Sequence, residues 1–178
     1  MKKLEIGQRT PDFSLPGVDG KDYSLGQYKD KKVLVVVFTC NHCPYAQAYE
    51  DRLLSLQRDY ADKGVQFIAI NSNDSAGYPE DDFDNMVRRA QKKLFTFPYL
   101  RDENQRIARA FGAEYTPEAF VLNSKLEVRY IGRIDDNWQN PDKVKLHDLR
   151  DALNAVLAHK KLDNPVTHAI GCTIKWKL

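Results

Sequence analysis

The stretch VLVVVFTCNHCPYAQAYEDRLLSLQRDYADKGVQFIAI, residues 33–70, decides the fold. Its first part, Val33 to Thr39, is a continuous β-branched and apolar run, as in strands that are covered on both faces. From Tyr45 the apolar residues recur at helical spacing, and Gly64 ends that pattern. Val65 to Ile70 is a second apolar run. This order predicts a β–α–β unit with two parallel strands and a right-handed crossover.

The flanking segments predict further elements of an α/β domain. Residues 12–15 and 22–25 alternate around the turn GVDG, which predicts a short β-hairpin before the first long strand. Helices are predicted over Glu80–Lys93, Asp102–Phe111 and Leu146–His159, and a strand hairpin over Ala119–Leu122 and Glu127–Ile131. The tail, residues 160–178, is irregular but carries apolar residues, so we expect it to pack on a single domain that spans residues 1–178.

Composition limits the classes of function. The chain has 178 residues, 42% of them apolar, and its 27 basic and 25 acidic residues give a net charge of +2. This balance predicts neither nucleic acid nor a membrane surface as a partner. No stretch approaches the roughly 20 apolar residues of a membrane helix. The first ten residues, MKKLEIGQRT, have no apolar core like that of a signal peptide, which predicts a cytoplasmic protein if Met1 is the native start.

Cys40 and Cys43 form a C-x-x-C pair where the first predicted strand gives way to the helix. The N–H groups of a helix N-terminus stabilise a thiolate, and thiols in such motifs reach pKa values of roughly 3.5–7.5, against about 8.5 for a free cysteine. The thiolate is the nucleophile of disulfide exchange. We therefore expect Cys40, at the exposed edge of the helix, to attack and Cys43, one turn further in, to resolve the mixed disulfide. Pro44 is expected to begin the regular helix.

His42 lies between the two cysteines. A protonated imidazole at this position favours the thiolate, stabilises the reduced pair and makes the disulfide more oxidising. The pair is therefore predicted to have a reduction potential above the thioredoxin value of about −270 mV. The alternative is that His42 is only a solvated neighbour of the pair.

Other roles remain open for the three cysteines. A C-x-x-C pair can be half of a zinc site or a structural disulfide. The sequence has no second C-x-x-C and no H-x-x-x-H, so we expect neither a metal nor an organic cofactor. Cys172 is either a third redox thiol that receives the disulfide from Cys40 and Cys43 or simply a buried cysteine.

The order of strand, C-x-x-C, helix, strand and helix, followed by Thr116-Pro117 before another strand, resembles the thioredoxin superfamily. The resemblance implies a thioredoxin-like α/β fold with a central mixed sheet flanked by helices. It also implies that Pro117 is a cis-proline that faces the cysteine pair. The backbone of Thr116 would then be free to pair with an extended substrate segment.

Several further segments resemble the redoxin branch of this superfamily, the alkyl-hydroperoxide-reductase and thiol-specific-antioxidant (AhpC/TSA) group. They are GQRTPDFSL (7–15), the insert after the β–α–β unit (72–100), FPYLRDENQRIARAF (97–111) and GCTIKWK (171–177). The last segment is similar to one in bacterial redoxin-like proteins that also carry a C-x-H-C-P-Y site. The branch contains both disulfide reductases and peroxidases.

The cysteine site differs from those of peroxiredoxins and of thioredoxins. Peroxiredoxins carry P-x-x-x-T-x-x-C, but counting back from Cys40 the threonine and proline positions hold Val37 and Val33. Thr39 stands where thioredoxins have tryptophan.

Further residues are candidates for the site. Many thioredoxins use a buried acidic residue as a proton acceptor, and Glu118 is the candidate for it here. Asn71, Ser72 and Asn73 follow the second parallel strand and either line the same face or form a turn.

These observations predict dithiol–disulfide exchange with protein or small-molecule disulfides. The expected electron donor is a thiol system such as thioredoxin or glutathione. A thiol-dependent peroxidase that takes peroxides is the alternative of the same fold. A binding or chaperone-like module with a vestigial site is the alternative of a different class.

Overall fold

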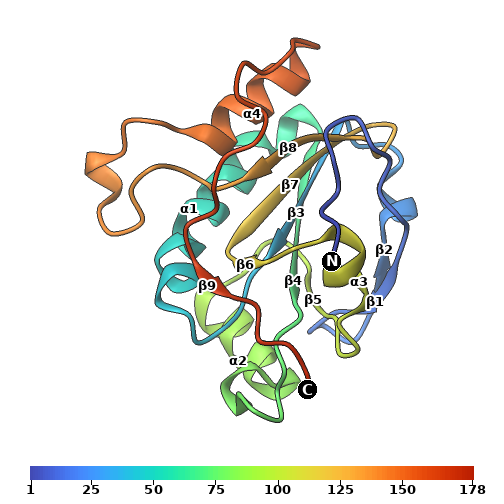
Figure 1. Cartoon of the computed structure of the whole chain (residues 1–178), viewed down its shortest axis with the longest axis vertical. Coiled ribbons are helices and arrows are strands. Elements are labelled where there is room, and N and C mark those ends of the chain that lie inside the picture. The colour runs from blue at the N-terminus through green and yellow to red at the C-terminus, as the bar shows by residue number, and fades with distance from the viewer.

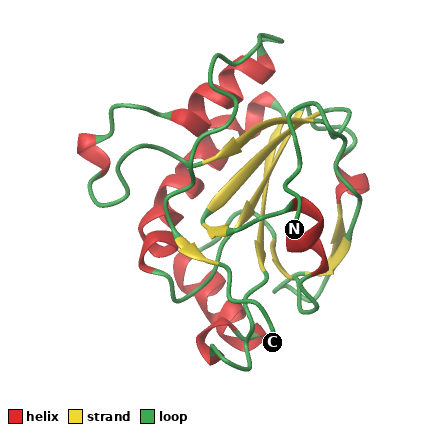
Figure 2. Cartoon of the chain, viewed as in Figure 1, coloured by secondary structure: helices red, strands yellow, loops and turns green.

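A five-stranded mixed sheet runs through the centre of the computed structural model, which describes residues 1–178 (Figures 1 and 2). The strand order is β5-β4-β3-β7-β8. Strands β3, β4 and β5 are parallel to one another, whereas β7 is antiparallel to both β3 and β8. The strands are β3 (Val33–Phe38), β4 (Val65–Asn71), β5 (Tyr99–Arg101), β7 (Glu118–Asn123) and β8 (Val128–Gly132). The predicted β–α–β unit therefore forms the middle of the sheet.

Helices cover both faces of the sheet, because alternate residues of the apolar strands point to opposite sides. Helices α1 (Pro44–Tyr60), α2 (Phe83–Lys93) and α4 (Asp148–Leu157) pack on one face (Figure 1). Helix α3 (Arg106–Phe111) packs on the other face, together with the N-terminal hairpin. The first core receives Val33, Val35 and Val37. The second core receives Leu34, Val36 and Phe38.

The N-terminal hairpin is present as predicted. Strands β1 (Ser14–Pro16) and β2 (Asp22–Ser24) pair antiparallel. Short 3-10 turns occupy the ranges η1 (Leu25–Tyr28), η2 (Ala61–Lys63), η3 (Pro79–Asp81) and η4 (Pro141–Lys143). None of the helices combines the length and the apolar composition that crossing a membrane requires.

The predicted helices over Glu80–Lys93, Asp102–Phe111 and Leu146–His159 are all shorter in the structure, and local contacts explain the first two. The segment predicted as one helix from Glu80 divides into η3 and α2, because Asp82 has an extended backbone and its carboxylate caps α2 by accepting the Asn85 N–H. Helix α3 begins at Arg106 instead of Asp102. The carboxylate of Asp102 nevertheless accepts the N–H groups of the first turn of α3.

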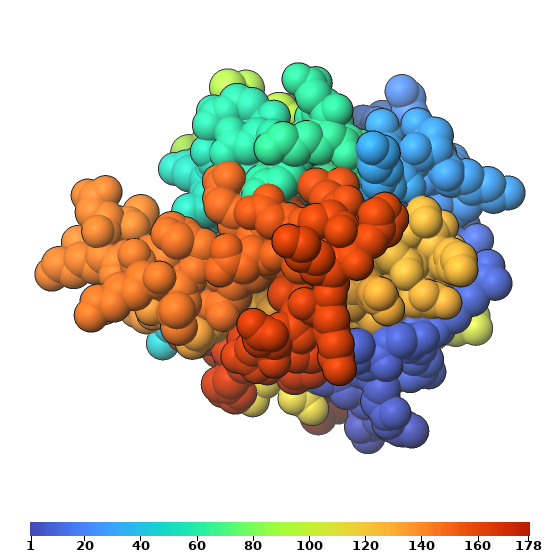
Figure 3. Space-filling model, turned by 90° about the horizontal axis from the view of Figure 1, so that it is seen from above, coloured from blue at the N-terminus to red at the C-terminus, as the bar shows by residue number.

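The C-terminal tail contains a strand that the sequence did not predict. Strands β6 (Tyr115–Thr116) and β9 (Cys172–Thr173) pair antiparallel, and Cys172 lies opposite Thr116. Ile174, next along the tail, is buried in the second core. In the space-filling view, the orange to red C-terminal part of the chain lies across the middle of the face shown (Figure 3). A pattern of two residues is too short to be recognised as a strand without its partner.

Candidate redox site

The C-x-x-C pair lies at the junction between β3 and α1. Cys40 is 2% exposed and Cys43 is fully buried. Helix α1 begins at Pro44, and Cys43, whose backbone is extended, is the N-cap residue. The expectation that Cys40 caps the helix at an exposed edge is therefore corrected. The physical reason is that the residues between the two cysteines remain outside the helix.

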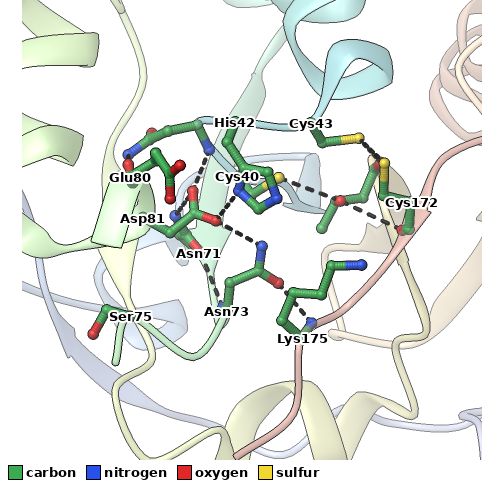
Figure 4. A network of polar contacts seen from close by, with 12 residues as sticks. Cys40, His42, Cys43, Asn71, Asn73, Ser75, Glu80, Asp81, Cys172 and Lys175 are labelled. Atoms are coloured by element: carbon green, nitrogen blue, oxygen red, sulfur yellow. Dashed lines mark hydrogen bonds and ion pairs between the residues drawn. The ribbon is translucent and has the colours of Figure 1, made fainter. Parts of the chain in front are cut away.

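The third cysteine, Cys172, contacts this pair. Its Sγ lies 2.7 Å from Cys43 Sγ (Figure 4). Cys43 Sγ also lies 3.4 Å from the carbonyl oxygen of Thr116. The thiol of Cys43 also interacts with that of Cys40. All three cysteines are free thiols, and Cys172 is the only one of them that is not buried. The fold therefore groups three thiols, with Cys43 between the other two.

The thiol with a lowered pKa is Cys43. The hydrogen bond with Cys40 lowers it most, followed by the hydrogen bond with Cys172 and that with the backbone of Ala46 in the first turn of α1, while burial opposes them. The same hydrogen bond raises the pKa of Cys40, and burial and the charge of Asp81 raise it further. The geometry therefore favours the thiolate on Cys43, whereas the sequence suggested Cys40.

The loop of the cis-proline faces the cysteines. The Thr116–Pro117 peptide bond is cis, as predicted, and Thr116 Oγ1 lies 3.4 Å from Cys40 Sγ. The prediction that the backbone of Thr116 is free to pair with a substrate segment is wrong. Strand β9 of the same chain occupies that edge, with Cys172 opposite Thr116.

A buried carboxylate organises the other side of Cys40. Asp81 is fully buried and accepts the Asn41 N–H at 2.6 Å and the side-chain amides of Asn71 and Asn73 at 3.2 and 2.8 Å. One of its oxygens lies 2.5 Å from Nδ1 of His42. Because buried carboxylates require hydrogen-bond partners, these four contacts explain how Asp81 is accommodated here. Asn71 and Asn73 thus line the site, one of the two possibilities that their position offered.

The imidazole of His42 contacts Asp81 and forms no hydrogen bond with Cys40 or Cys43. Its ring is stacked on Tyr78, with ring centroids 5.4 Å apart and planes 10° from parallel. The side chain is a quarter exposed. His42 is therefore more than a solvated neighbour, because it joins the surface to the buried carboxylate beside Cys40.

Three side chains around Cys40 could together hold a metal ion. A ring nitrogen of His42, a carboxylate oxygen of Asp81 and Sγ of Cys40 all lie within 4.8 Å of one another. Imidazole, carboxylate and thiolate are all zinc ligands, and structural zinc takes four of them. The two oxygens of Asp81 already have hydrogen-bond partners within the protein.

Glu118 is buried, but its hydrogen-bond partners lie away from the sulfur atoms. Its carboxylate pairs with Lys3 and accepts the N–H groups of Glu114 and Tyr115. It therefore anchors the start of the cis-proline loop to the N-terminal segment. The acidic residue beside Cys40 is Asp81, which the sequence did not identify. The only signal was its place in the acidic run Glu80–Asp82, which also fits the first turn of a helix.

Comparisons with known proteins identify a family and several relatives that the chain resembles. A family model described as Redoxin matches residues 5–153. The chain is 26% identical over 130 residues to the thiol-disulfide oxidoreductase ResA of Geobacillus thermodenitrificans, which covers 72% of this chain and 69% of that protein. It is 27% identical over 112 residues to the peroxiredoxin Bcp of Escherichia coli, with 63% and 67% covered.

Solved structures show the same architecture. The structure of a hypothetical protein from Sinorhizobium meliloti superposes with a TM-score of 0.92 at 35% identity and covers 99% of this chain and 97% of that chain. A putative thiol:disulfide interchange protein DsbE from Chlorobium tepidum superposes with a TM-score of 0.70 at 22% identity, with 87% and 99% covered. The likeness to the second structure concerns the fold alone, and that fold is the thioredoxin-like fold predicted from the sequence.

Proposed function

The chain belongs to the Redoxin family, and we propose that it is a thiol–disulfide oxidoreductase whose redox couple is Cys40 and Cys43. The observation that carries this proposal is the grouping of these thiols at the N-terminus of α1, where one has a lowered pKa and faces the cis-proline loop. A thiolate held in this way is the nucleophile that disulfide exchange requires. The name of the relative ResA supports the same reaction class.

The roles within the couple form part of the proposal. Attack by Cys40 and resolution by Cys43 is the order that the sequence suggested, and the lowered pKa of Cys43 favours the reverse order. Alkylation of the reduced protein with a limiting amount of iodoacetamide, followed by peptide mapping, separates the two. First labelling at Cys40 supports the order suggested by the sequence, and first labelling at Cys43 reverses it.

The surrounding residues position the couple. Pro44 begins α1 and so places the N-cap at Cys43, while the Thr116 hydroxyl contacts Cys40. His42 contacts the carboxylate of Asp81, which lies beside Cys40. We propose protein or small-molecule disulfides as substrates, with a thiol system such as thioredoxin or glutathione as the partner.

The test of this function is disulfide reduction by the full chain. Reduced wild-type protein is expected to accelerate insulin reduction, and to lose two titratable thiols when it is oxidised with a stoichiometric amount of cystamine. Cys43→Ser should abolish the acceleration and Cys40→Ser should reduce it, whereas Tyr45→Phe, a conservative change in the same turn of α1, should retain it. Equal rates for wild type and Cys40→Ser would exclude the proposed function.

A thiol-dependent peroxidase is the second candidate. One observation that favours it is the relative Bcp, which is named a peroxiredoxin. The other is the Thr116 hydroxyl beside Cys40 Sγ, because the chain lacks the threonine of the peroxiredoxin motif before Cys40. Steady-state consumption of hydrogen peroxide with glutathione as reductant distinguishes the two. Peroxide turnover that exceeds cystamine turnover would favour the peroxidase.

Location is also a proposal. We propose that the protein is cytoplasmic, the location expected from the sequence. Cell fractionation followed by immunoblotting tests this, and recovery with the membranes or outside the cell would contradict it.

A further inference from the structure

The C-terminal tail holds Cys172 against the redox couple by several independent contacts. Strand β9 pairs with β6, and Gly171 lies so close to that strand that a Cβ on it would be 2.2 Å from the carbonyl oxygen of Thr116. No side chain can be accommodated at that distance. A glycine at position 171 therefore allows the tail to approach the cis-proline loop closely enough to bring Cys172 Sγ to 2.7 Å from Cys43 Sγ.

Contacts on the far side of Cys172 fix the tail as well. The Ile174 N–H donates to the carbonyl oxygen of Glu114 at 2.9 Å. The Lys175 N–H donates to Oδ1 of Asn73 at 2.9 Å, and its carbonyl oxygen accepts from the Gln105 side chain at 2.8 Å. These bonds connect the tail to three different parts of the domain. The position of Cys172 is thus determined by the fold and is not that of a free end.

The three thiols differ in their access to solvent. Cys43 is fully buried and Cys40 nearly so, whereas Cys172 is partly exposed. We propose that Cys172 is the thiol through which an external thiol reductant regenerates the couple. This proposal rests on the proposed exchange at Cys40 and Cys43. It adds a separate route by which the electron donor reduces the couple.

The reaction is a sequence of thiol–disulfide exchanges. Starting from the Cys40–Cys43 disulfide, the Cys172 thiolate attacks Cys43 Sγ, so that a Cys43–Cys172 bond forms and Cys40 leaves as a thiolate that takes up a proton. An external thiolate then attacks Cys172 Sγ and releases Cys43 as a thiolate. A second external thiol attacks the external sulfur of the mixed disulfide and releases Cys172. Overall, two external thiols are oxidised to one disulfide and the couple is reduced.

Electrostatics distinguishes the oxidised from the reduced state at Cys172. In the reduced protein, burial raises the pKa of Cys172 most, and the hydrogen bond with Cys43 and its charge raise it further, while Lys175 opposes them. When Cys43 is in a disulfide with Cys40, it carries neither the charge nor the hydrogen bond. Cys172 is then more easily ionised, at the stage where its thiolate is needed as the nucleophile.

The first experiment asks whether Cys172 and Cys43 can form a disulfide. Cys40→Ser and Cys40→Ala proteins, whose folding is checked by circular dichroism, are oxidised with cystamine and mapped by mass spectrometry. The expected product is an intramolecular Cys43–Cys172 disulfide, seen as the loss of two hydrogen atoms. Cystamine adducts or free thiols at both positions would overturn the proposal. In wild type, the same bond is expected as a minor species during partial reduction.

The second experiment measures regeneration of the oxidised couple by glutathione in single-turnover mixing. Cys172→Ser should form the Cys40–Cys43 disulfide as wild type does, but should be reduced about tenfold more slowly, because the remaining disulfide is buried. Thr173→Ala, an exposed change in the same strand, should match wild type. Equal regeneration rates for Cys172→Ser and wild type would overturn the proposal. Failure of wild type to form any Cys40–Cys43 disulfide would instead remove the proposed function on which it rests.

Discussion

The β3–α1 junction and the C-terminal tail bring sulfur atoms to the same point by different physical means. The junction places Cys40 and Cys43 through a continuous buried strand and a helix that begins at the next residue. The tail places Cys172 through a two-residue strand and single hydrogen bonds to distant loops. The first arrangement depends mainly on the core of the domain, whereas the second depends mainly on a few hydrogen bonds between segments far apart in the chain.

Because of this difference, the stability of the domain and the reactivity of Cys172 depend on different regions of the chain. A change in the core near the junction affects the whole domain, since α1 and the central strand share that core. A change in the tail can move Cys172 while the Cys40–Cys43 couple stays in place. Substitutions in the two regions should therefore give different combinations of unfolding and redox defects, and the following predictions test that contrast.

The largest expected effect is on stability, from the strand that leads to the couple. Phe38 is fully buried in β3 and contacts Phe111 and Phe120 with ring centroids 5.4 and 5.8 Å apart. Phe38→Ala should lower the free energy of unfolding by about 3–5 kcal/mol, measured by urea denaturation. Val166→Ala, at a half-exposed position in the tail, should change it by less than about 0.5 kcal/mol. Similar losses for both variants would contradict the contrast.

Gly171→Ala tests the tail without removing a thiol. The added methyl group collides with the backbone at Thr116, so Cys172 should be displaced from Cys43. Regeneration by glutathione is then expected to slow by about tenfold, as for Cys172→Ser, because access to the buried disulfide is lost. Formation of the Cys40–Cys43 disulfide should be unchanged. A rate equal to wild type would show that the close approach of the tail is not needed.

Asp81→Asn tests the charge beside Cys40 with a side chain of the same shape. Because the negative charge of Asp81 raises the pKa of Cys40, its removal should lower that pKa. Titration of the thiolate absorbance of reduced protein measures the change, and Glu118→Gln, whose carboxylate has no contact with the sulfurs, is the matched control. An unchanged titration of Cys40 would contradict the prediction.

The smallest expected effect is a pH dependence of the reduced protein. Cys43 has a pKa lowered from the ordinary thiol value of about 8.5, so below that pH the unfolded chain binds more protons than the folded chain, and stability should rise with pH toward about 8.5. Cys40 has a raised pKa, so above about pH 8.5 the unfolded chain ionises first and stability should fall. Urea unfolding of reduced protein at a series of pH values should show this maximum. In a Cys40→Ser, Cys43→Ser double variant the maximum should flatten.

Much of the site was predictable because it is encoded in neighbouring residues. The strand, the C-x-x-C pair and the helix that follows are contiguous, and Thr116-Pro117 directly precedes a strand. The N-cap position was predicted wrongly, at Cys40 instead of Cys43, because the helical pattern indicates that a helix follows but not which residue begins its hydrogen bonds. Glu118 is the acidic residue that the sequence indicates, because it adjoins Pro117, whereas Asp81 lies in an acidic run that also fits the start of a helix.

The sequence by itself determined the α/β class, the parallel unit at the centre of the sheet, and the cysteine pair where the strand gives way to a helix. These follow from hydrophobic periodicity and from residues adjacent in the chain, which act through local backbone geometry. Only the tertiary structure decided that Asp81 lies beside Cys40 and that Cys172 reaches Cys43. Those contacts join segments far apart along the chain, and they form only when packing of the two cores has fixed where each loop and the tail can lie.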